Sequence, residues 1–255
     1  MIKKNILLFF LLWIQTASGF VVLIDPGHGG KELGAVGVFK KKNSKGKIYD
    51  HKVYEKDLTL KVALYLKKEL QKSFSTYLTR SFDRTVSLEE RAELAETVKA
   101  DVFISIHFNS SEEHNSHGFE TYYLDNHQDK AIKKVEAIEN TGLEGENKII
   151  NQILIDLAIQ KTVPNSKKLA NAIHVAIGKK IQKFKMRDRG IKPGLFYVLA
   201  LSKRPGVLLE GGFMSQPDEL KKIHKISFLK KYALSIAKGI KEFQKTLPEK
   251  SLPLF

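Results

Sequence analysis

The sequence of 255 residues contains no cysteine, so no disulfide bond holds the fold together. A chain of this length buries a core that is large enough to fold without disulfides. Hydrophobic residues make up 42% of the sequence, which excludes a largely disordered chain. We therefore expect a globular protein, and the length favours one domain with room for an insertion.

Long apolar runs are also scarce. The run Ile6–Ile14 is too short to span a bilayer, which takes roughly 20 residues. It follows two lysines and precedes the small residues Ala17 and Gly19, a pattern typical of a secretory signal peptide. We predict a signal peptide at residues 1–19, with export to the periplasm or, as an alternative, to the outside of the cell. An uncleaved membrane anchor is the competing interpretation. At the other end of the chain, residues 248–255 are expected to form a loose tail.

Acidic residues are in the minority. The chain has 28 Asp and Glu against 43 Lys and Arg, which gives a formal net charge of +15. This excess favours anionic partners, such as the phosphate- and carboxylate-rich cell envelope. The lysines are not set among the stacking aromatic side chains that single-stranded nucleic acid requires, and the predicted export also argues against nucleic acid. A generally solvated basic surface is the simplest explanation for most of these lysines.

Apolar, β-rich segments alternate with amphipathic helical segments, which predicts an α/β fold with helices packed on a sheet. The expected strands are residues 20–25, 74–79, 101–108, 118–124, 195–199 and 206–212. The expected helices are residues 55–72, 87–98, 165–181 and 227–245. A long polar loop is expected between the first strand and the first helix. Residues 125–163 contain two further helical stretches that interrupt the alternation, so we interpret this segment as an insertion.

A glycine-rich stretch, "DPGHGG" at residues 25–30, follows the first predicted strand. A dinucleotide-binding fingerprint would need a third glycine at the position of Glu32. A phosphate-binding loop is excluded as well, because Glu32 follows Gly30 and Lys31 where Ser or Thr is required. With both nucleotide motifs excluded, the chemically interesting residue of this stretch is His28, at the carboxyl end of a predicted strand.

Two histidines, His28 and His107, stand at the ends of predicted strands. In an open α/β sheet the carboxyl ends of the strands form the ligand-binding edge, so both imidazoles can reach one place. Glu55 begins the first predicted helix, and a normal crossover brings its carboxylate near the same edge. Two imidazoles and one carboxylate are a ligand set of catalytic zinc that leaves a fourth position open for water. The simpler alternatives are a turn histidine at His28 and an acid favoured by the helix dipole at Glu55.

Glu210 closes an apolar predicted strand and precedes two glycines. A carboxylate in such a position is costly unless it has a partner. Beside a metal-activated water it would act as the general base, taking the proton of the water and passing it to the leaving nitrogen. The alternative is an ion pair with one of the many lysines.

Several motifs occur in a fixed order over nearly the whole predicted mature chain: "IDPGHGG", the glutamate of "EKDLTL", "LTR" with "LEERAELA", "ADVFISIHFNS", "GFETYYL" and "VLLEGGFMSQPDE". Together they resemble the zinc-dependent N-acetylmuramoyl-L-alanine amidases, the type 3 family of bacterial cell-wall amidases. The resemblance implies a single domain, residues 20–247, with a twisted, mostly parallel sheet flanked by helices. It implies one Zn²⁺ per chain bound by His28, Glu55 and His107, with Glu210 as the catalytic glutamate. The implied reaction is hydrolysis of the amide between N-acetylmuramic acid and L-alanine in peptidoglycan, for cell-wall remodelling or daughter-cell separation.

Further residues match the same family. For Arg80 and Arg91 we expect structural ion pairs rather than contact with a substrate carboxylate. Asn109, just beyond His107, is expected to bind substrate. The insertion at 125–163 resembles the regulatory helices of division-associated members, in which a glutamate can occupy the open position of the zinc. The stretch "VEAIEN" offers Glu136 and Glu139, and we favour Glu139.

These expectations also concern partners and competing functions. We expect peptidoglycan or muropeptides as substrate, an activator protein that displaces the helices of the insertion, and a monomeric chain. A plain helical cover is the alternative for the insertion. A zinc carboxypeptidase or endopeptidase acting on stem peptides is the alternative for the activity, because activated water attacks any suitably placed amide. A non-catalytic wall-binding protein would lack at least one of the four site residues, and all four are present.

Overall fold

The computed structural model describes residues 19–112, 116–140 and 147–248, with the backbone alone over residues 147–154. The predicted signal peptide, residues 1–19, lies outside the described residues except for Gly19. The predicted tail, residues 248–255, lies outside them except for Pro248. In the part of the chain that is described, no helix combines the length and the apolar character needed to cross a membrane.

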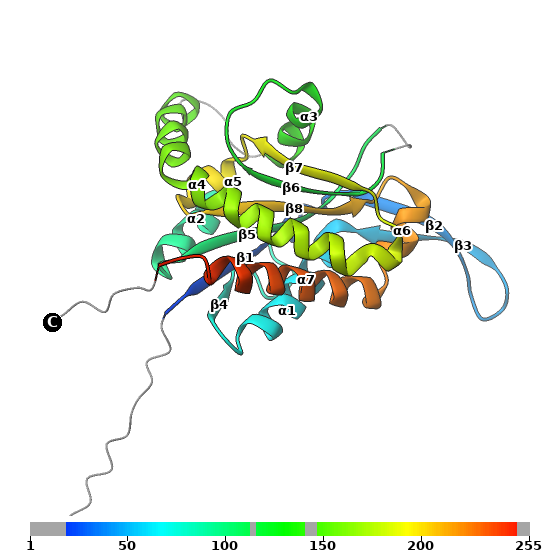
Figure 1. Ribbon diagram of the computed structural model, residues 1–255. Coiled ribbons are helices and arrows are strands. Elements are labelled where there is room, and N and C mark those ends of the chain that lie inside the picture. Colours follow the sequence, from blue (N-terminus) through cyan, green and yellow to red (C-terminus); the bar gives the residue numbers. More distant parts are fainter. Residues whose placement is uncertain (1–18, 113–115, 141–146, 249–255) are drawn as a thin grey trace, which may run out of the picture.

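A six-stranded sheet forms the centre of the molecule (Figure 1). Its strands are β1 (Val21–Pro26), β4 (Ser75–Leu78), β5 (Val102–Asn109), β6 (Phe119–Leu124), β7 (Asp188–Gly194) and β8 (Gly206–Phe213). The spatial order is β4-β1-β5-β8-β6-β7, and every neighbouring pair is parallel except β6 with β8. The mostly parallel sheet is therefore confirmed. Every residue of the two central strands, β5 and β8, is buried, which explains their nearly continuous apolar sequences.

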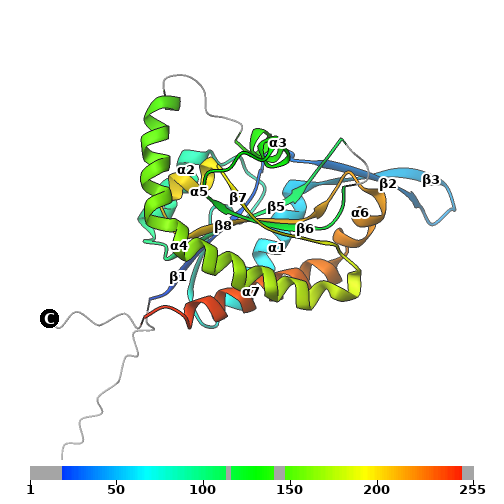
Figure 2. The ribbon, with the colours of Figure 1, turned by 45° about the horizontal axis from the view of Figure 1, so that its top comes forward.

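Helices cover both faces of this sheet (Figures 1 and 2). One face carries α1 (Glu55–Leu70), α7 (Ile226–Gln244) and the carboxyl-terminal part of α4 (Asn147–Ile181). The other carries α2 (Leu88–Thr97), α5 (Tyr197–Ser202) and the part of α4 around Ile155 and Ala158. Each face of the sheet packs a hydrophobic core against its helices: the first core lies against α1 and α7, and the second lies against α2 and α5. Successive side chains of a strand point to opposite faces, so Val22 and Ile24 of β1 lie in the first core and Leu23 lies in the second. Both cores share one sheet, which confirms a single α/β domain. The remaining helices are α3 (Lys130–Glu139), α6 (Pro217–Ile223) and the 3-10 helix η1 (Gln182–Phe184).

Two expectations of local structure were wrong. The polar loop before the first helix contains an antiparallel hairpin of β2 (Val36–Lys42) and β3 (Ile48–Tyr54), whose strands are mostly exposed and therefore lack the apolar signal of a core strand. The strand expected at 195–199 is also absent, because α5 begins at Tyr197 and the strand β7 precedes it. A short apolar run does not distinguish a buried strand from a buried helix.

The insertion is joined to the domain more closely than the sequence suggested. Its second helical stretch and the helix expected at 165–181 form one helix, α4, with Pro164 inside it. Proline lacks the N–H and crowds the preceding turn, and Figure 2 shows α4 bending part-way along its length. Ile155 and Ala158 lie in the second core. The only helix of the described part of the insertion that stands apart from α4 is α3.

Candidate metal centre

The loop after β1 presents His28. The backbone of this histidine is left-handed, with φ at 59°, and the following Gly29 has φ at 130°. A Cβ atom on Gly27 would lie 2.3 Å from Cε1 of His107, so only glycine lets the His107 ring pack against this loop. The two imidazole rings approach to 4.9 Å between centroids. The glycines of the opening motif thus allow a sharp turn and the close approach of two histidines.

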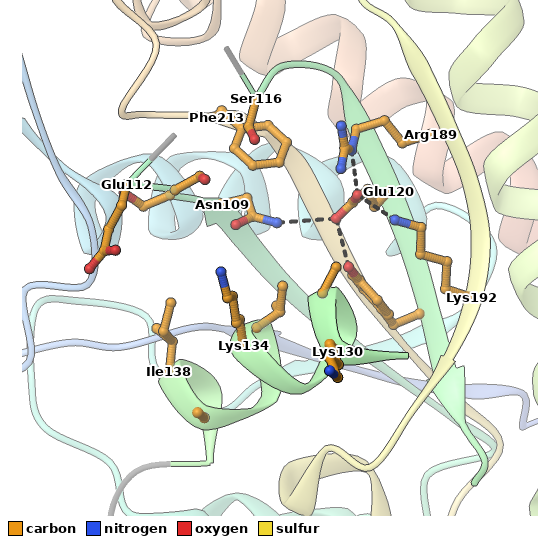
Figure 3. A pocket seen from close by; sticks show the side chains of 16 residues that line it. Asn109, Glu112, Ser116, Glu120, Lys130, Lys134, Ile138, Arg189, Lys192 and Phe213 are labelled. Carbon is orange, nitrogen blue, oxygen red and sulfur yellow. Dashed lines mark hydrogen bonds and ion pairs between the residues drawn. The ribbon is translucent and has the colours of Figure 1, made fainter. Parts of the chain in front are cut away.

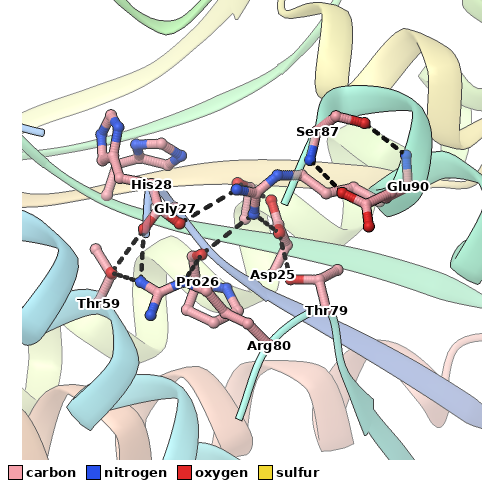
Figure 4. A network of polar contacts seen from close by, with 12 residues as sticks. Asp25, Pro26, Gly27, His28, Thr59, Thr79, Arg80, Ser87 and Glu90 are labelled. Atoms are coloured by element: carbon pink, nitrogen blue, oxygen red, sulfur yellow. Dashed lines mark hydrogen bonds and ion pairs between the residues drawn. The ribbon is translucent and has the colours of Figure 1, made fainter. Parts of the chain in front are cut away.

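The Asp25 carboxylate fixes this loop to the sheet (Figure 4). It forms a buried ion pair with Arg91 of α2 and accepts hydrogen bonds from the hydroxyls of Thr79 (2.6 Å) and Ser105 (2.9 Å). Burial alone would raise the pKa of Asp25, but the Arg91 guanidinium and the hydrogen bond from Thr79, with a smaller effect of His107, together outweigh burial and lower that pKa below its usual value. Arg91 also donates from Nη2 to the His28 carbonyl at 3.2 Å. The structural ion pair expected for Arg91 is present, and it holds the backbone of His28 directly.

Arg80 supports the same loop in a different way. Its side chain is 1% exposed and donates from Nε to the Pro26 carbonyl at 3.0 Å and from Nη2 to the Gly27 carbonyl at 2.8 Å. Nη2 also donates to the carbonyl of Lys56 in α1 at 2.9 Å. The role is structural, but the expectation of an ion pair was wrong for Arg80, because its hydrogen-bond partners among the described residues are backbone carbonyl oxygens and the Thr59 hydroxyl. Its burial leaves no access for a substrate carboxylate.

The three residues predicted to bind zinc converge at the carboxyl edge of the sheet. Nε2 of His28 lies 3.1 Å from Oε2 of Glu55, and Nδ1 of His107 lies 3.2 Å from Oε1 of Glu55. Two ligand atoms on one tetrahedral ion with bonds of about 2.0–2.2 Å lie about 3.3–3.6 Å apart. Together with Glu139, these residues place their ligand atoms within 4.8 Å of one another. The structure therefore brings all three together at a spacing that suits one ion.

Glu55 is the first residue of α1 and is oriented by the backbone of two other elements. Its Oε2 accepts a hydrogen bond from the Ala35 N–H at 2.8 Å, and its Oε1 accepts one from the Phe108 N–H at 2.9 Å. Burial disfavours the charged form of Glu55, but His28 and His107 together outweigh burial and lower the pKa of Glu55 far below its usual value. The carboxylate is therefore ionised and held in place for a cation.

Glu139, the last residue of α3, is the fourth member of this group. Its Oε2 lies 2.7 Å from Nδ1 of His107 and 3.7 Å from Nε2 of His28. Glu136 is engaged elsewhere, because its Oε1 accepts a hydrogen bond from the Leu195 N–H at 2.5 Å. The sequence left open which glutamate of "VEAIEN" reaches the histidines, and the geometry selects Glu139.

The carboxyl end of α3 is tied to the connection between β7 and α5. Nδ2 of Asn140 donates to the Leu195 carbonyl at 2.7 Å, and its Oδ1 accepts from the Tyr197 N–H at 2.8 Å. Glu136 adds a third hydrogen bond to the same segment, through the Leu195 N–H. These three bonds hold α3 in the position that brings Glu139 to the histidines.

Glu210 lies beside this group in the centre of the sheet. It is in register with His107 of β5 on one side and with Glu120 of β6 on the other. The side chain is fully buried, and neither of its carboxyl oxygens has a hydrogen-bond partner among the described residues. Burial and, after it, the charge of Glu139 raise the pKa of Glu210 well above its usual value. A buried carboxyl without a partner is costly and is typical of a functional site.

The donor set fits a divalent metal ion. Nε2 of His28 and Nδ1 of His107 are buried and make no well-aligned hydrogen bond to a described residue, although carboxylate oxygens lie close to both. Burial opposes protonation of His107, but Glu139 and Glu55 outweigh it and raise the pKa of His107 well above its usual value. The group therefore favours positive charge where its ligand atoms converge, and it could bind a metal ion.

A cavity of about 730 Å³ lies between α3 and the sheet (Figure 3). Asn109 lines it, and Nδ2 of Asn109 donates to Oε2 of Glu120 at 3.1 Å. Glu120 pairs with Arg189 and Lys192, and none of these three residues was predicted to belong to the site. Like Glu210, Glu120 is a charged residue within an apolar strand, and this pattern could have identified it.

The chain matches one protein family over most of its length. The family model for N-acetylmuramoyl-L-alanine amidase matches residues 22–242. The N-acetylmuramoyl-L-alanine amidase AmiC of Escherichia coli O6:H1 is 27% identical over 235 residues, a match that covers 88% of this chain and 52% of AmiC. The chain therefore spans about half the length of this relative.

Solved structures agree with the family match. The crystal structure of an N-acetylmuramoyl-L-alanine amidase from Clostridium difficile 630 is 29% identical with a TM-score of 0.65, and the match covers 91% of this chain and 100% of the other. The CwlD amidase from Clostridioides difficile, solved in complex with the GerS lipoprotein, is 23% identical with a TM-score of 0.64, covering 89% and 99%. At the lower identity the likeness concerns the fold alone.

Proposed function

The chain belongs to the N-acetylmuramoyl-L-alanine amidase family, and on this premise we propose that it hydrolyses the amide between N-acetylmuramic acid and L-alanine in peptidoglycan. The observation that carries this proposal is the convergence of His28, Glu55 and His107 beside the buried carboxyl of Glu210. Such a reaction serves cell-wall remodelling or the separation of daughter cells.

We propose that one Zn²⁺ per chain is bound by His28, Glu55 and His107. Two imidazoles and a carboxylate match the ligand set of a catalytic zinc, and the backbone hydrogen bonds of Glu55 hold its carboxylate in place. When bound, the ion polarises the scissile carbonyl and acidifies the attacking water. Metal analysis of the purified protein should find one zinc per chain, and the variant His107→Ala should lose it. If the purified wild type contains no zinc and takes up none when Zn²⁺ is added, this assignment is wrong.

Glu210 performs the proton transfers of the proposed reaction. Its carboxyl has no hydrogen-bond partner among the described residues, so it is free to take the proton of the attacking water. It then delivers this proton to the amide nitrogen as the C–N bond breaks, which gives a lactyl carboxylate and the free amine of L-alanine. The variant Glu210→Gln keeps the shape but removes the base, and it should cleave about 10²- to 10⁴-fold more slowly with unchanged zinc content. Unchanged cleavage would refute this role.

The alternative enzyme is a zinc carboxypeptidase or endopeptidase of the same polymer. The family match favours the amidase. Mass spectrometry of a digest of purified sacculi distinguishes the two, because an amidase frees intact stem peptides from the glycan and a peptidase shortens the stems. Metal analysis of the same sample tests the cofactor.

We propose further that α3 inhibits the enzyme by placing Glu139 at the open position of the metal. The Glu139 carboxylate lies in the same 4.8 Å group as the three proposed ligands, where the attacking water would otherwise bind. The neighbouring residues have a separate task, because Glu136 and Asn140 tie the end of α3 to residues 195–197. Blocking and holding are thus performed by different side chains of one helix end.

Point variants test the separate roles proposed for Glu139 and Asn140. Glu139→Ala should raise the basal rate by removing the blocking carboxylate. Asn140→Ala should also raise it, because it breaks two hydrogen bonds that hold α3 without touching the metal ligands. Lys133→Ala, on the exposed side of α3, is the matched control and should leave the rate unchanged. If neither Glu139→Ala nor Asn140→Ala increases the rate, α3 is a plain helical cover.

We propose that a protein partner activates the enzyme by displacing α3. Leu157 of α4 is 57% exposed, so its apolar side chain is available for contact with a partner. The neighbour CwlD was solved with a lipoprotein, so this fold accepts a protein partner. A true activator should accelerate the wild type strongly and the Glu139→Ala variant little. Equal acceleration of both would contradict displacement of α3.

The pattern of residues 1–19 supports a proposal of export, with the periplasm as the destination and the outside of the cell as the alternative. Cell fractionation and amino-terminal sequencing test it, and the mature protein should begin at Phe20. Light scattering on the purified mature protein tests the expected monomer.

A further inference from the structure

We propose that Arg189 and Lys192 bind a carboxylate on the peptide half of the substrate, in the cavity beside Glu210. The inference rests on the proposed function and adds the substrate class that the site selects. It predicts a preference for muropeptides whose stem carries free carboxylates over those whose carboxylates are amidated.

Glu120 of β6 organises the cationic part of this cavity (Figure 3). Its Oε1 accepts hydrogen bonds from Nε of Arg189 at 2.5 Å and from Nζ of Lys192 at 2.6 Å. Its Oε2 accepts from the Tyr122 hydroxyl at 2.6 Å and from Nδ2 of Asn109 at 3.1 Å. Burial disfavours the charge of Glu120, but the hydrogen bonds from Arg189, Lys192 and Tyr122, with the charge of Lys192, together outweigh burial and lower its pKa. One negative charge thus faces two positive charges, and the cluster retains a net positive charge on fixed side chains.

Arg189 keeps unused donors. Only its Nε bonds to Glu120, while the guanidinium lies over the Phe213 ring at 5.2 Å from the centroid. Its terminal nitrogens, Nη1 and Nη2, make no hydrogen bond to a residue that the structure describes. They form the planar fork that recognises a carboxylate through two parallel hydrogen bonds. Glu112 also lines this cavity, and Lys130 and Lys134 of α3 add positive charge to it while α3 is docked.

The chemistry of the substrate decides which half meets these cations. Before cleavage the lactyl carboxyl of the sugar is part of the amide, so the N-acetylated glycan half brings no negative charge to the site. The peptide half ends in at least one carboxylate. A second cavity of about 270 Å³, which His28 and His107 line, has the carboxylates of Asp25, Glu32, Glu89 and Glu139 and the single guanidinium of Arg91 among its residues. Its own side chains therefore disfavour that carboxylate. Electrostatics therefore place the peptide in the cavity of Arg189 and the glycan on the other side.

The peptide cavity adjoins the proposed reacting centre. Glu120 is in register with Glu210, and neighbouring strands of a sheet lie about 4.8 Å apart. Asn109 lines the cavity two residues beyond His107 on the same strand. The cavity measures about 730 Å³ with α3 in place, which is in the range of sites that hold small ligands. Displacement of α3 would leave its sheet side, with Arg189 and Lys192, open to a peptide.

Two synthetic N-acetylmuramoyl peptides test the proposal, identical except that one carries free carboxylates and the other carboxamides. We measure kcat/KM in the zinc-loaded wild type and in the Glu139→Ala variant. The carboxylate form should be cleaved about 10- to 100-fold more efficiently, chiefly through KM, as expected for loss of a charged hydrogen-bond pair. Arg189→Lys keeps the charge, loses the fork and should reduce this preference about 10-fold. Arg204→Lys is the matched control. Arg204 lies just before the start of β8 and pairs with Glu96, so this variant should retain the full preference.

A second measurement requires no turnover. Isothermal titration of the free stem peptide into the full-length zinc-loaded protein should show tighter binding of the acid form than of the amide form, and Arg189→Lys should remove the difference. If Arg189→Lys does not fold like the wild type by its thermal unfolding midpoint, Lys192→Met takes its place. The proposal is wrong if the wild type cleaves and binds the acid and amide forms equally well. It is also wrong if these variants leave the preference unaltered. Either result would leave the proposed amidase activity unaffected. Cleavage of neither substrate by either the wild type or Glu139→Ala would overturn the proposed function itself.

Discussion

Replacing Asp25 with asparagine tests how strongly a buried ion pair fixes the loop that carries His28. Asp25 is 1% exposed, and its carboxylate contacts the Arg91 guanidinium and the hydroxyls of Thr79 and Ser105. Asparagine preserves the size and one acceptor oxygen but removes the charge. The Arg91 guanidinium, which is also buried, then remains without a compensating carboxylate.

The expected cost follows from that uncompensated charge. Removal of one partner from a buried ion pair lowers the free energy of unfolding by about 3–5 kcal/mol. The matched control is Asp50→Asn in the β2–β3 hairpin, where Asp50 pairs with Lys40 at 2.7 Å and both side chains are more than half exposed. An exposed pair contributes about 0–1 kcal/mol. Urea unfolding at pH 7 should therefore separate the two variants by at least about 2 kcal/mol.

The same variant has a defined pH dependence. Folding lowers the pKa of Asp25 below its usual value of 3.8, so its contribution to stability is complete above the unfolded value and is lost as the pH falls through the lower folded value. The difference between the wild type and Asp25→Asn should therefore narrow below about pH 4. If Asp25→Asn lowers the free energy of unfolding at pH 7 by less than about 1 kcal/mol, as little as Asp50→Asn does, then a buried ion pair does not fix this loop.

Other perturbations give separate outcomes. Arg80→Met should lower the free energy of unfolding in urea by about 1–3 kcal/mol, less than Asp25→Asn, because the Thr59 hydroxyl still donates to the Gly27 carbonyl. A larger decrease would show that Arg80 stabilises more of the fold than this loop. Glu210→Gln should slow muropeptide cleavage about 10²- to 10⁴-fold and change the free energy of unfolding by less than about 1 kcal/mol, and a large loss of both activity and stability would indicate a structural role. Chelation of the metal should stop cleavage and lower the thermal unfolding midpoint, and added Zn²⁺ should restore both, whereas activity that persists at zero zinc content would refute a metal mechanism. Glu139→Ala should raise the initial rate of dye release from labelled sacculi, and a lower rate would contradict inhibition by α3.

Local sequence patterns predicted a large part of the fold because they depend on neighbours along the chain. The spacing of Ser87 and Glu90 predicted a capping box at the start of α2, and both of its hydrogen bonds are present. The near-continuous apolar run of β5 predicted a central strand, which is confirmed. The gathering of His28, Glu55 and His107 could also be expected, because parallel strands end at one edge of the sheet and the crossover helix starts there.

Tertiary structure decided the rest. Glu136 and Glu139 stand three residues apart on the same helix, and only the docking of α3 through Asn140 determines which of them faces the histidines. Glu120 pairs with Arg189 and Lys192 from 69 and 72 residues away, and no periodicity in the sequence connects them. The sequence alone therefore determined the α/β class and the residues able to bind a metal. Which glutamate contacts the histidines, and which cations pair with Glu120, arose only from the packing of distant segments, because such contacts depend on the path of the chain through space rather than on its local pattern.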